Sequence, residues 1–194
     1  MNDRNPLLVH TERLKDALDA MLSLSDEVDR AAAAIATSLR AGGTVFVAGN
    51  GGSAAEAQHL VGELVGRLSA ERERPPLRAA ALTGDPSTMT ALGNDYGFSE
   101  IFARQVESLM RPGDVLVVLS TSGRSANLVA AVRRAATIGG VTVGLLGGTR
   151  RDLHDLCDHV IAVPASSTAT IQECHLALVH VLVEWVEDRL AARA

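Results

Sequence analysis

The stretch that most constrains the fold runs from residue 44 to residue 67, with the sequence TVFVAGNGGSAAEAQHLVGELVGR. Residues 44–48 form a short apolar run rich in valine, which is typical of a buried strand. Residues 49–53 form a turn with almost no side-chain bulk, and the residues after it favour a helix with Ser53 at or near its N-cap. This succession predicts an anion site, because free backbone N–H groups and the helix dipole point the same way.

The helix predicted after this turn carries three residues of chemical interest. His59, Glu63 and Arg67 are spaced four apart, so they lie along one face of the helix. One segment can therefore hold a phosphate at its turn and present a metal ligand, a carboxylate and a guanidinium beyond it.

Composition limits what kind of protein this is. The 194 residues suffice for one α/β domain, and the net charge of −5 does not favour a nucleic-acid partner. Lys15 is the only lysine and lies in the N-terminal helical region, which argues against Schiff-base catalysis. Cys157 and Cys174 are too few for a disulfide framework. The chain shows no apolar signal segment or membrane span, so we expect a cytoplasmic protein without a membrane partner.

Apolar runs and helical patterns alternate along the chain. The runs are continuous, as in a parallel sheet covered on both faces. We expect a single domain over residues 1–194: helices in 1–40, broken near 23–25, and a three-layer α/β/α sandwich over 44–192 with a five-stranded parallel, flavodoxin-like sheet. The N-terminal helical extension either packs on a partner subunit or only covers the sheet. The expected strands are 44–48, 77–82, 114–119, 141–146 and 159–163, the later helices are 98–110, 126–138, 150–157 and 168–192, and a polar turn is expected at 93–97.

Residues 120–125 (STSGRS) follow the third expected strand and precede a helix. Four hydroxyls and a glycine there suit a phosphate monoester, although one hydroxyl would also serve as an ordinary helix cap. Residues 49–54 formally fit a dinucleotide-binding pattern. The acidic residue that this pattern requires at the end of the next strand is missing, so a nicotinamide cofactor is not favoured.

The last helix and the polar turn hold further candidates. Gln172 and His180 are eight residues apart, roughly 80° around a helix, so they can flank one site from neighbouring turns. A histidine on an otherwise apolar helix is equally consistent with a core residue. Asn94 and Asp95 are ordinary turn formers as well as candidate polar contacts. His10 is expected to be solvated.

Taken together, four motifs resemble those of the SIS (sugar isomerase) domain family and, within it, the sedoheptulose 7-phosphate (phosphoheptose) isomerases. The resemblance extends from roughly residue 10 to residue 190 and rests on the order and spacing of the motifs as a set. The motifs are GNGGSAAEAQH-x3-E-x3-R, GNDYGF, STSGRS and IQECH-x4-H.

The resemblance implies a reaction and a set of site residues. It implies the isomerisation of D-sedoheptulose 7-phosphate to D-glycero-D-manno-heptose 7-phosphate, the first step of nucleotide-activated heptose biosynthesis, with Glu63 and His180 as acid and base. It also implies a homotetramer with sites between subunits. The zinc ligands implied are His59, Glu63, Gln172 and His180. The substrate contacts implied are Asn50, Gly51, Gly52, Glu63, Asn94, Asp95, Ser120, Thr121, Ser122, Ser125 and Gln172.

An alternative of a different class is a related SIS adaptor that has no catalytic activity and binds the bacterial replication initiator. It shares the fold and the serine-rich turn, and its pattern lacks a counterpart of His180. A binding module has no need of a histidine and carboxylate set, so the sequence favours the enzyme. Arg124 departs from the asparagine that close relatives often carry, and its role stays open.

Overall fold

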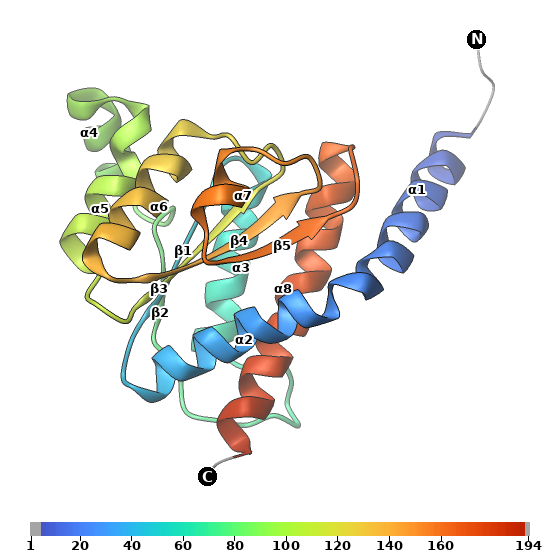
Figure 1. Cartoon of the computed structure of the whole chain (residues 1–194), viewed down its shortest axis with the longest axis horizontal. Coiled ribbons are helices and arrows are strands. Elements are labelled where there is room, and N and C mark those ends of the chain that lie inside the picture. Colours follow the sequence, from blue (N-terminus) through green and yellow to red (C-terminus); the bar gives the residue numbers. More distant parts are fainter. Residues whose placement is uncertain (1–4, 193–194) are drawn as a thin grey trace.

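A sheet of five parallel strands forms the centre of the protein, in the order β2-β1-β3-β4-β5 (Figure 1). The computed structural model describes residues 5–192. The topology confirms the expected flavodoxin-like sheet. The strands are β1 Val45–Gly49, β2 Ala79–Ala81, β3 Val115–Ser120, β4 Val141–Gly147 and β5 His159–Val163.

Helices cover both faces of the sheet, as predicted for a three-layer sandwich. Side chains alternate along each strand, so that Val117 points into one layer and Val118 into the other. The first layer contains α1 Pro6–Met21, α2 Ser25–Arg40, α3 Gly52–Val65 and α8 Thr168–Ala191. The second contains α4 Pro86–Tyr96, α5 Ile101–Leu109, α6 Ala126–Ile138 and α7 Asp152–Leu156.

The glycine-rich turn after β1 differs from the prediction in where its helix starts. The N-cap of α3 is Gly51, and the helix begins at Gly52 rather than at Ser53. Gly51 has a φ of 58°, which a residue with a side chain rarely adopts. Ser53 is instead buried in the first turn. Asn50 and Gly51 thus turn the chain sharply enough for α3 to begin directly beyond the carboxyl end of β1.

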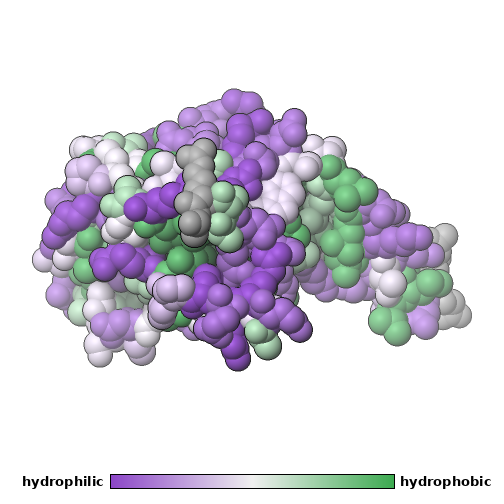
Figure 2. Space-filling view, turned by 90° about the horizontal axis from the view of Figure 1, so that it is seen from below, coloured by the Kyte–Doolittle hydropathy of each residue, from purple (hydrophilic) through white to green (hydrophobic). Residues whose placement is uncertain are grey.

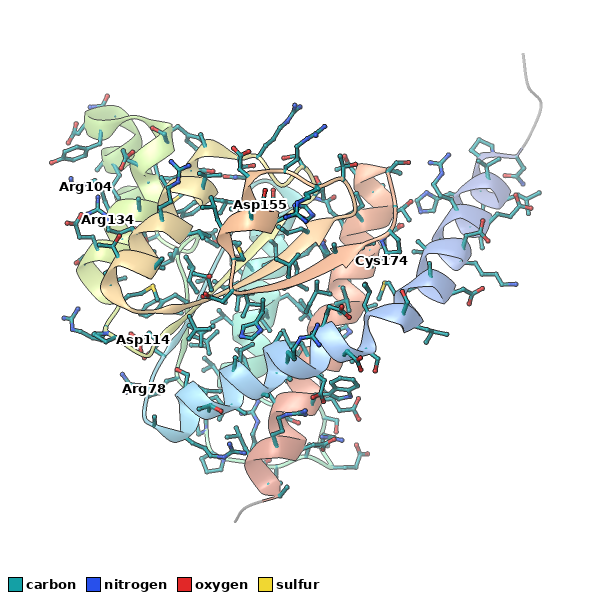
Figure 3. The ribbon with its side chains drawn as sticks, in the orientation of Figure 1. Arg78, Arg104, Asp114, Arg134, Asp155 and Cys174 are labelled. Atoms are coloured by element: carbon teal, nitrogen blue, oxygen red, sulfur yellow. The ribbon has the colours of Figure 1, made fainter. Side chains whose placement is uncertain are left out.

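At the amino ends of the strands, Asp114 immediately precedes β3 and fixes where this strand starts (Figure 3). Its two carboxylate oxygens accept hydrogen bonds from the backbone N–H of Thr44, at 2.8 Å, and of Arg111, at 2.7 Å. The carboxylate therefore ties the residues that precede β1 and β3 to each other. This anchor sets the register of the two central strands, whose carboxyl ends carry the glycine-rich and serine-rich turns.

The expected polar turn at 93–97 is wrong, because α4 continues to Tyr96. The side chain of Asp85 accepts from the backbone N–H of Ser87, and Pro86 starts the helix. Gly97, with a φ of 85°, then ends it. These end signals outweigh the turn preference of the asparagine and aspartate inside the helix. The second strand is also shorter than expected, and residues 98–100 form a 3₁₀ turn before α5.

Helix α1 projects from the body of the protein (Figure 1). Hydrophobic side chains are visible on this projecting segment (Figure 2), and Leu7 and Leu22 are 72% and 80% exposed. His10 is not simply solvated, because its Nε2 lies 2.7 Å from a carboxylate oxygen of Glu173 on α8. Among residues 5–192, no helix has the length and hydropathy needed to cross a membrane.

Candidate active site

His59, Glu63 and His180 meet on the outer surface of the first helical layer, and we call them the His59–Glu63–His180 cluster. Each offers one ligand atom, and these atoms lie within 4.8 Å of one another. His59 Nε2 lies 2.9 Å from His180 Nε2 and 3.5 Å from Glu63 Oε1. In the part of the chain that the structure describes, no other group of histidine, cysteine and acidic residues comes together in this way.

The cluster forms because α3 and α8 lie side by side and run in the same direction. Both helices begin just beyond the carboxyl end of a strand, α3 after β1 and α8 after β5. Gly52 at the start of α3 lies against Gln172 near the start of α8. Two turns further on, His59 lies against His180. Because the two helices run in parallel, His59 and Glu63, which are four residues apart on α3, lie at the same height as His180 on α8.

The donor set and the spacing of the cluster suit zinc. Two histidines and a glutamate are ordinary zinc ligands. Ligand atoms about 2.0–2.1 Å from a tetrahedral ion are about 3.3–3.4 Å apart. The distances of 2.9 and 3.5 Å between ligand atoms in the cluster are close to that value. The three side chains can therefore share one ion with only small movements.

Gln172, the fourth predicted ligand, lies elsewhere along α8. Its side-chain amide rests so close to Gly52 that a methyl group added there would lie 2.5 Å from the amide nitrogen. Eight residues separate Gln172 from His180, a rise of about 12 Å along a helix. Gly52 thus makes room for this amide, and the metal-binding role of Gln172 stays a prediction.

A pair of titratable groups, Glu56 and His175, lies between the level of Gln172 and the level of His180. Glu56 Oε2 is 3.9 Å from Nδ1 of His175, which is fully buried. Burial raises the pKa of Glu56 to about 7, although a hydrogen bond with Ser53 partly lowers it. Burial lowers the pKa of His175 to about 4, against a smaller opposite effect of the Leu146 backbone. His175 is therefore the core histidine of α8, uncharged at neutral pH, and His180 is the exposed one.

The serine-rich turn leaves most of its hydroxyls open to a ligand. Ser120 is buried, and its hydroxyl accepts from the backbone N–H of Gly123. Ser125 is the N-cap of α6, but its side chain makes no capping hydrogen bond. Ser122 is exposed, and Thr121 is partly exposed. A turn that served only to cap α6 would use the Ser125 hydroxyl, so this geometry favours the phosphate interpretation.

Asn127 joins the two turns, and sequence reasoning missed it. The amide groups of Asn50 and Asn127 exchange two hydrogen bonds, of 3.0 and 2.8 Å. Asn127 is 2% exposed and belongs to the first turn of α6. The sequence signal that could have identified Asn127 is an asparagine among the apolar residues at the start of α6. The pair holds the glycine-rich turn and the serine-rich turn next to each other at the carboxyl edge of the sheet.

Asn94, Asp95 and Arg67 lie outside both the cluster and the two turns. Asn94 and Asp95 are exposed at the end of α4, which belongs to the opposite helical layer, and their side chains bond to each other (Figure 1). Arg67 pairs with Glu73 across the loop that follows α3 rather than with Glu63. The contacts predicted for Asn94 and Asp95 need either a long substrate or a second chain.

Comparison with known proteins gives one consistent family. Residues 10–147 match the model of the SIS domain. The chain is 49% identical over 179 residues to a phosphoheptose isomerase of Rhodospirillum rubrum, covering 91% of this chain and 94% of that one. It is 48% identical to the phosphoheptose isomerase of Aquifex aeolicus, covering 82% and 83% of the two chains. A solved phosphoheptose isomerase structure from Francisella tularensis superposes with a TM-score of 0.89 at 36% identity, covering 97% of this chain and all of that one.

Proposed function

Because this chain belongs to the SIS domain family and is an isomerase, we propose that it converts D-sedoheptulose 7-phosphate into D-glycero-D-manno-heptose 7-phosphate. One observation carries the proposal: a carboxylate and two imidazoles, from helices far apart in sequence, meet at one point on the surface. The name shared by the relatives, phosphoheptose isomerase, supports a heptose phosphate as the substrate.

The reaction moves a proton between two adjacent carbons. A base takes a proton from C1, next to the C2 carbonyl, while an acid protonates the carbonyl oxygen, which gives an enediol. The enediol is then protonated at C2, and the hydroxyl on C1 gives up its proton and becomes the aldehyde. The site therefore needs one group that exchanges a proton with carbon and one that serves the oxygens.

Glu63 and His180 are the proposed acid–base pair. A carboxylate and an imidazole are suited to proton transfer near neutral pH. Glu63 is partly shielded, with 20% of its side chain exposed, and His180 is exposed. The carboxylate has two oxygens, so Glu63 can bind a metal with one and take up a proton at the other. A neutral imidazole that binds a metal through Nε2 keeps its proton on Nδ1, so His180 can only donate a proton there while it is a ligand.

We extend the proposal to one zinc ion per subunit, held by His59, Glu63 and His180 with Gln172 as the fourth ligand. When bound, zinc supplies Lewis acidity that polarises the substrate carbonyl and stabilises charge on the two adjacent oxygens. The contributions of the chain itself are the placement of the ligands by α3 and α8 and the partial shielding of Glu63 from water.

The serine-rich turn is the proposed phosphate site. The backbone N–H groups at the start of α6 and the open hydroxyls of Thr121, Ser122 and Ser125 suit a dianion. Asn50, held by Asn127, is the proposed contact for the sugar chain, and Gly51 and Gly52 leave room beside it. The two turns lie at the carboxyl edge of the sheet, where ligands bind in folds of this type.

A homotetramer with sites between subunits is the proposed assembly. Apolar side chains border the His59–Glu63–His180 cluster: Val65 is 44%, Leu176 40% and Val181 37% exposed. The projecting helix α1 adds further exposed leucines (Figure 2). Surfaces of this kind are typical of subunit interfaces. A second chain would also bring Asn94 and Asp95 of its α4 to a site that lacks them here.

The assembly predicts a mass in solution four times the 20.3 kDa of one chain. Multi-angle light scattering measures it. Leu22→Asp, at an exposed position of the segment that joins α1 and α2, is expected to give smaller species, because it places a charge in the proposed interface. Leu22→Met is the control and is expected to remain tetrameric. A parent protein with the mass of one chain would contradict shared sites.

The activity itself predicts that the purified protein, supplied with zinc, forms an aldoheptose phosphate from sedoheptulose 7-phosphate. Proton NMR of the product and loss of the C1 hydrogen in deuterated water measure turnover and the proton transfer together. Fructose 6-phosphate, a shorter ketose phosphate, is the control substrate and is expected to react far more slowly. No turnover of the heptose phosphate, together with tight binding to a replication initiator, would favour the adaptor instead.

A further inference from the structure

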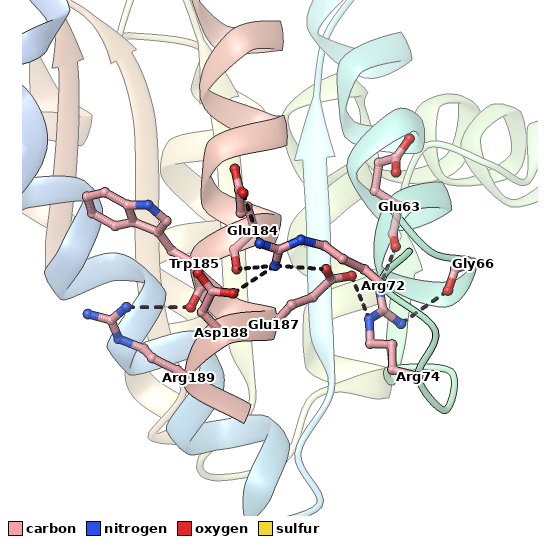
Figure 4. Close-up of polar contacts among 9 residues, drawn as sticks. All are labelled: Glu63, Gly66, Arg72, Arg74, Glu184, Trp185, Glu187, Asp188 and Arg189. Atoms are coloured by element: carbon pink, nitrogen blue, oxygen red, sulfur yellow. Dashed lines mark hydrogen bonds and ion pairs between the residues drawn. The ribbon is translucent and has the colours of Figure 1, made fainter. Parts of the chain in front are cut away.

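Arg74, in the loop between α3 and β2, binds the backbone carbonyls at the C-terminal end of α3. The side chain of Arg74 is only 12% exposed. Its guanidinium donates to the backbone carbonyls of Glu63, at 2.7 Å, and of Gly66, at 3.1 Å (Figure 4). It also donates to the backbone carbonyl of Leu64, at 2.9 Å. The last carbonyls of a helix have no partner within it. Arg74 therefore closes the terminal turn of α3, the turn that carries the Glu63 carboxylate.

The same guanidinium also binds α8. Nε of Arg74 lies 2.7 Å from a carboxylate oxygen of Glu187, which is 6% exposed (Figure 4). Glu187 follows His180 by seven residues, two turns along the same stripe of the helix. One side chain thus connects the end of α3 that carries Glu63 to α8 at a point two turns beyond His180.

A second arginine reinforces this connection from the same loop. Arg72 donates to Glu184 at 2.9 Å and to Asp188 at 2.8 Å, and it lies 3.6 Å from the other oxygen of Glu187 (Figure 4). Burying an ion pair costs desolvation and often contributes little net stability. Glu187 is buried and Arg74 is 12% exposed, so we expect their pair to contribute mainly by fixing the geometry of the two helices rather than by adding net stability.

We propose that Arg74 is a positioning residue for the isomerisation, holding Glu63 at its working distance from His59 and His180 through the backbone of α3 and through Glu187. This inference rests on the proposed roles of Glu63 and His180. An error of about 1 Å in the placement of a catalytic group can cost about 10²-fold in rate, so a connection of this kind affects turnover directly. Arg74 contacts the cluster only through the backbone carbonyl of Glu63 and hydrogen-bonds to no cluster side chain and to no residue of the proposed phosphate turn, so its effect is expected on kcat rather than on KM.

Arg74→Lys is the variant that tests this. Lysine keeps the charge, but a single ammonium cannot serve three carbonyls and a carboxylate in a fixed plane. We expect kcat to fall at least about tenfold, KM to change less than about threefold, and the affinity of the metal-free protein for Zn²⁺ to fall about tenfold. Steady-state kinetics and competition with a chromophoric chelator measure these quantities. A role limited to stability would lower the melting temperature without this split.

Arg189→Lys is the matched control. Arg189 lies on α8, where it donates to the backbone carbonyl of Trp185 (Figure 4), and its side chain pairs with Asp29 of α2 rather than with α3. It is expected to behave like the parent. If Arg74→Lys matches Arg189→Lys in both kcat and zinc affinity, the inference is overturned.

If Arg74→Lys fails to fold, Glu187→Gln replaces it as the test, because glutamine keeps the shape of the side chain and removes its charge. Glu187→Gln is expected to lower kcat and zinc affinity with little change in KM, and parent values of kcat and zinc affinity in this variant overturn the inference. A parent that binds Zn²⁺ without turning over the heptose phosphate refutes the proposed function, and the zinc affinities alone then decide this inference.

Discussion

Replacing Glu63 with glutamine is expected to lower kcat for sedoheptulose 7-phosphate by about 10²–10⁴-fold, the usual contribution of a general acid–base group. Glutamine keeps the size and the polar tip of the side chain but cannot accept a proton from carbon. Arg74 holds the backbone at residue 63 through its carbonyl, and the substitution leaves that contact in place. The fold should therefore survive, and the loss should appear in turnover rather than in thermal stability.

The measurement is steady-state kinetics of the purified variant at saturating Zn²⁺, because Glu63 is also a proposed zinc ligand, with circular dichroism melting as the check on folding. Glu71→Gln serves as the matched control, because Glu71 is exposed in the loop after α3 and the substitution makes the same change in charge. It is expected to keep the parent rate. A Glu63→Gln enzyme within about threefold of the parent would remove Glu63 from the acid–base role.

The fold could be predicted from the sequence because its signals are local. Each central strand is an unbroken apolar run, and helical patterns separate the strands. The errors fall where two local signals compete. In α4, Asn94 and Asp95 favour a turn, yet the cap at Asp85 and the proline after it carry the helix past them to Gly97. At α3, the φ of Gly51 decides where the helix starts, and composition alone does not reveal it.

The candidate site could be predicted only as separate pieces. The spacing of His59 and Glu63 is visible in one segment, but their meeting with His180 joins residues 121 positions apart. The Asn50–Asn127 pair spans 77 positions, and the contacts of Arg74 with α8 span 113. Such pairs depend on how α3, α6 and α8 pack on the sheet, which no local pattern encodes. The family resemblance predicted which residues form the site, and the structure shows that three of the proposed metal ligands, His59, Glu63 and His180, lie close together.

A comparison of His59→Gln with His180→Gln is expected to separate metal binding from proton transfer. Both histidines offer Nε2 to the cluster, 2.9 Å apart, so each substitution should weaken Zn²⁺ binding by about 10–100-fold or more. Only His180 has a proposed role in the acid–base chemistry. At zinc concentrations that saturate both variants, His59→Gln should therefore regain most of the parent rate, while His180→Gln should remain about 10²-fold slower.

Titration of the metal-free proteins with Zn²⁺, followed by kinetics at saturation, makes this comparison. His159→Gln is the control, because His159 begins β5 and lies outside the cluster, so zinc affinity and rate should both stay at the parent values. Equal recovery of the two cluster variants would restrict His180 to metal binding and leave Glu63 as the only acid–base residue proposed. Parent zinc affinity in both variants would refute the metal site at the His59–Glu63–His180 cluster, because a site that loses one of three or four ligands cannot keep its affinity.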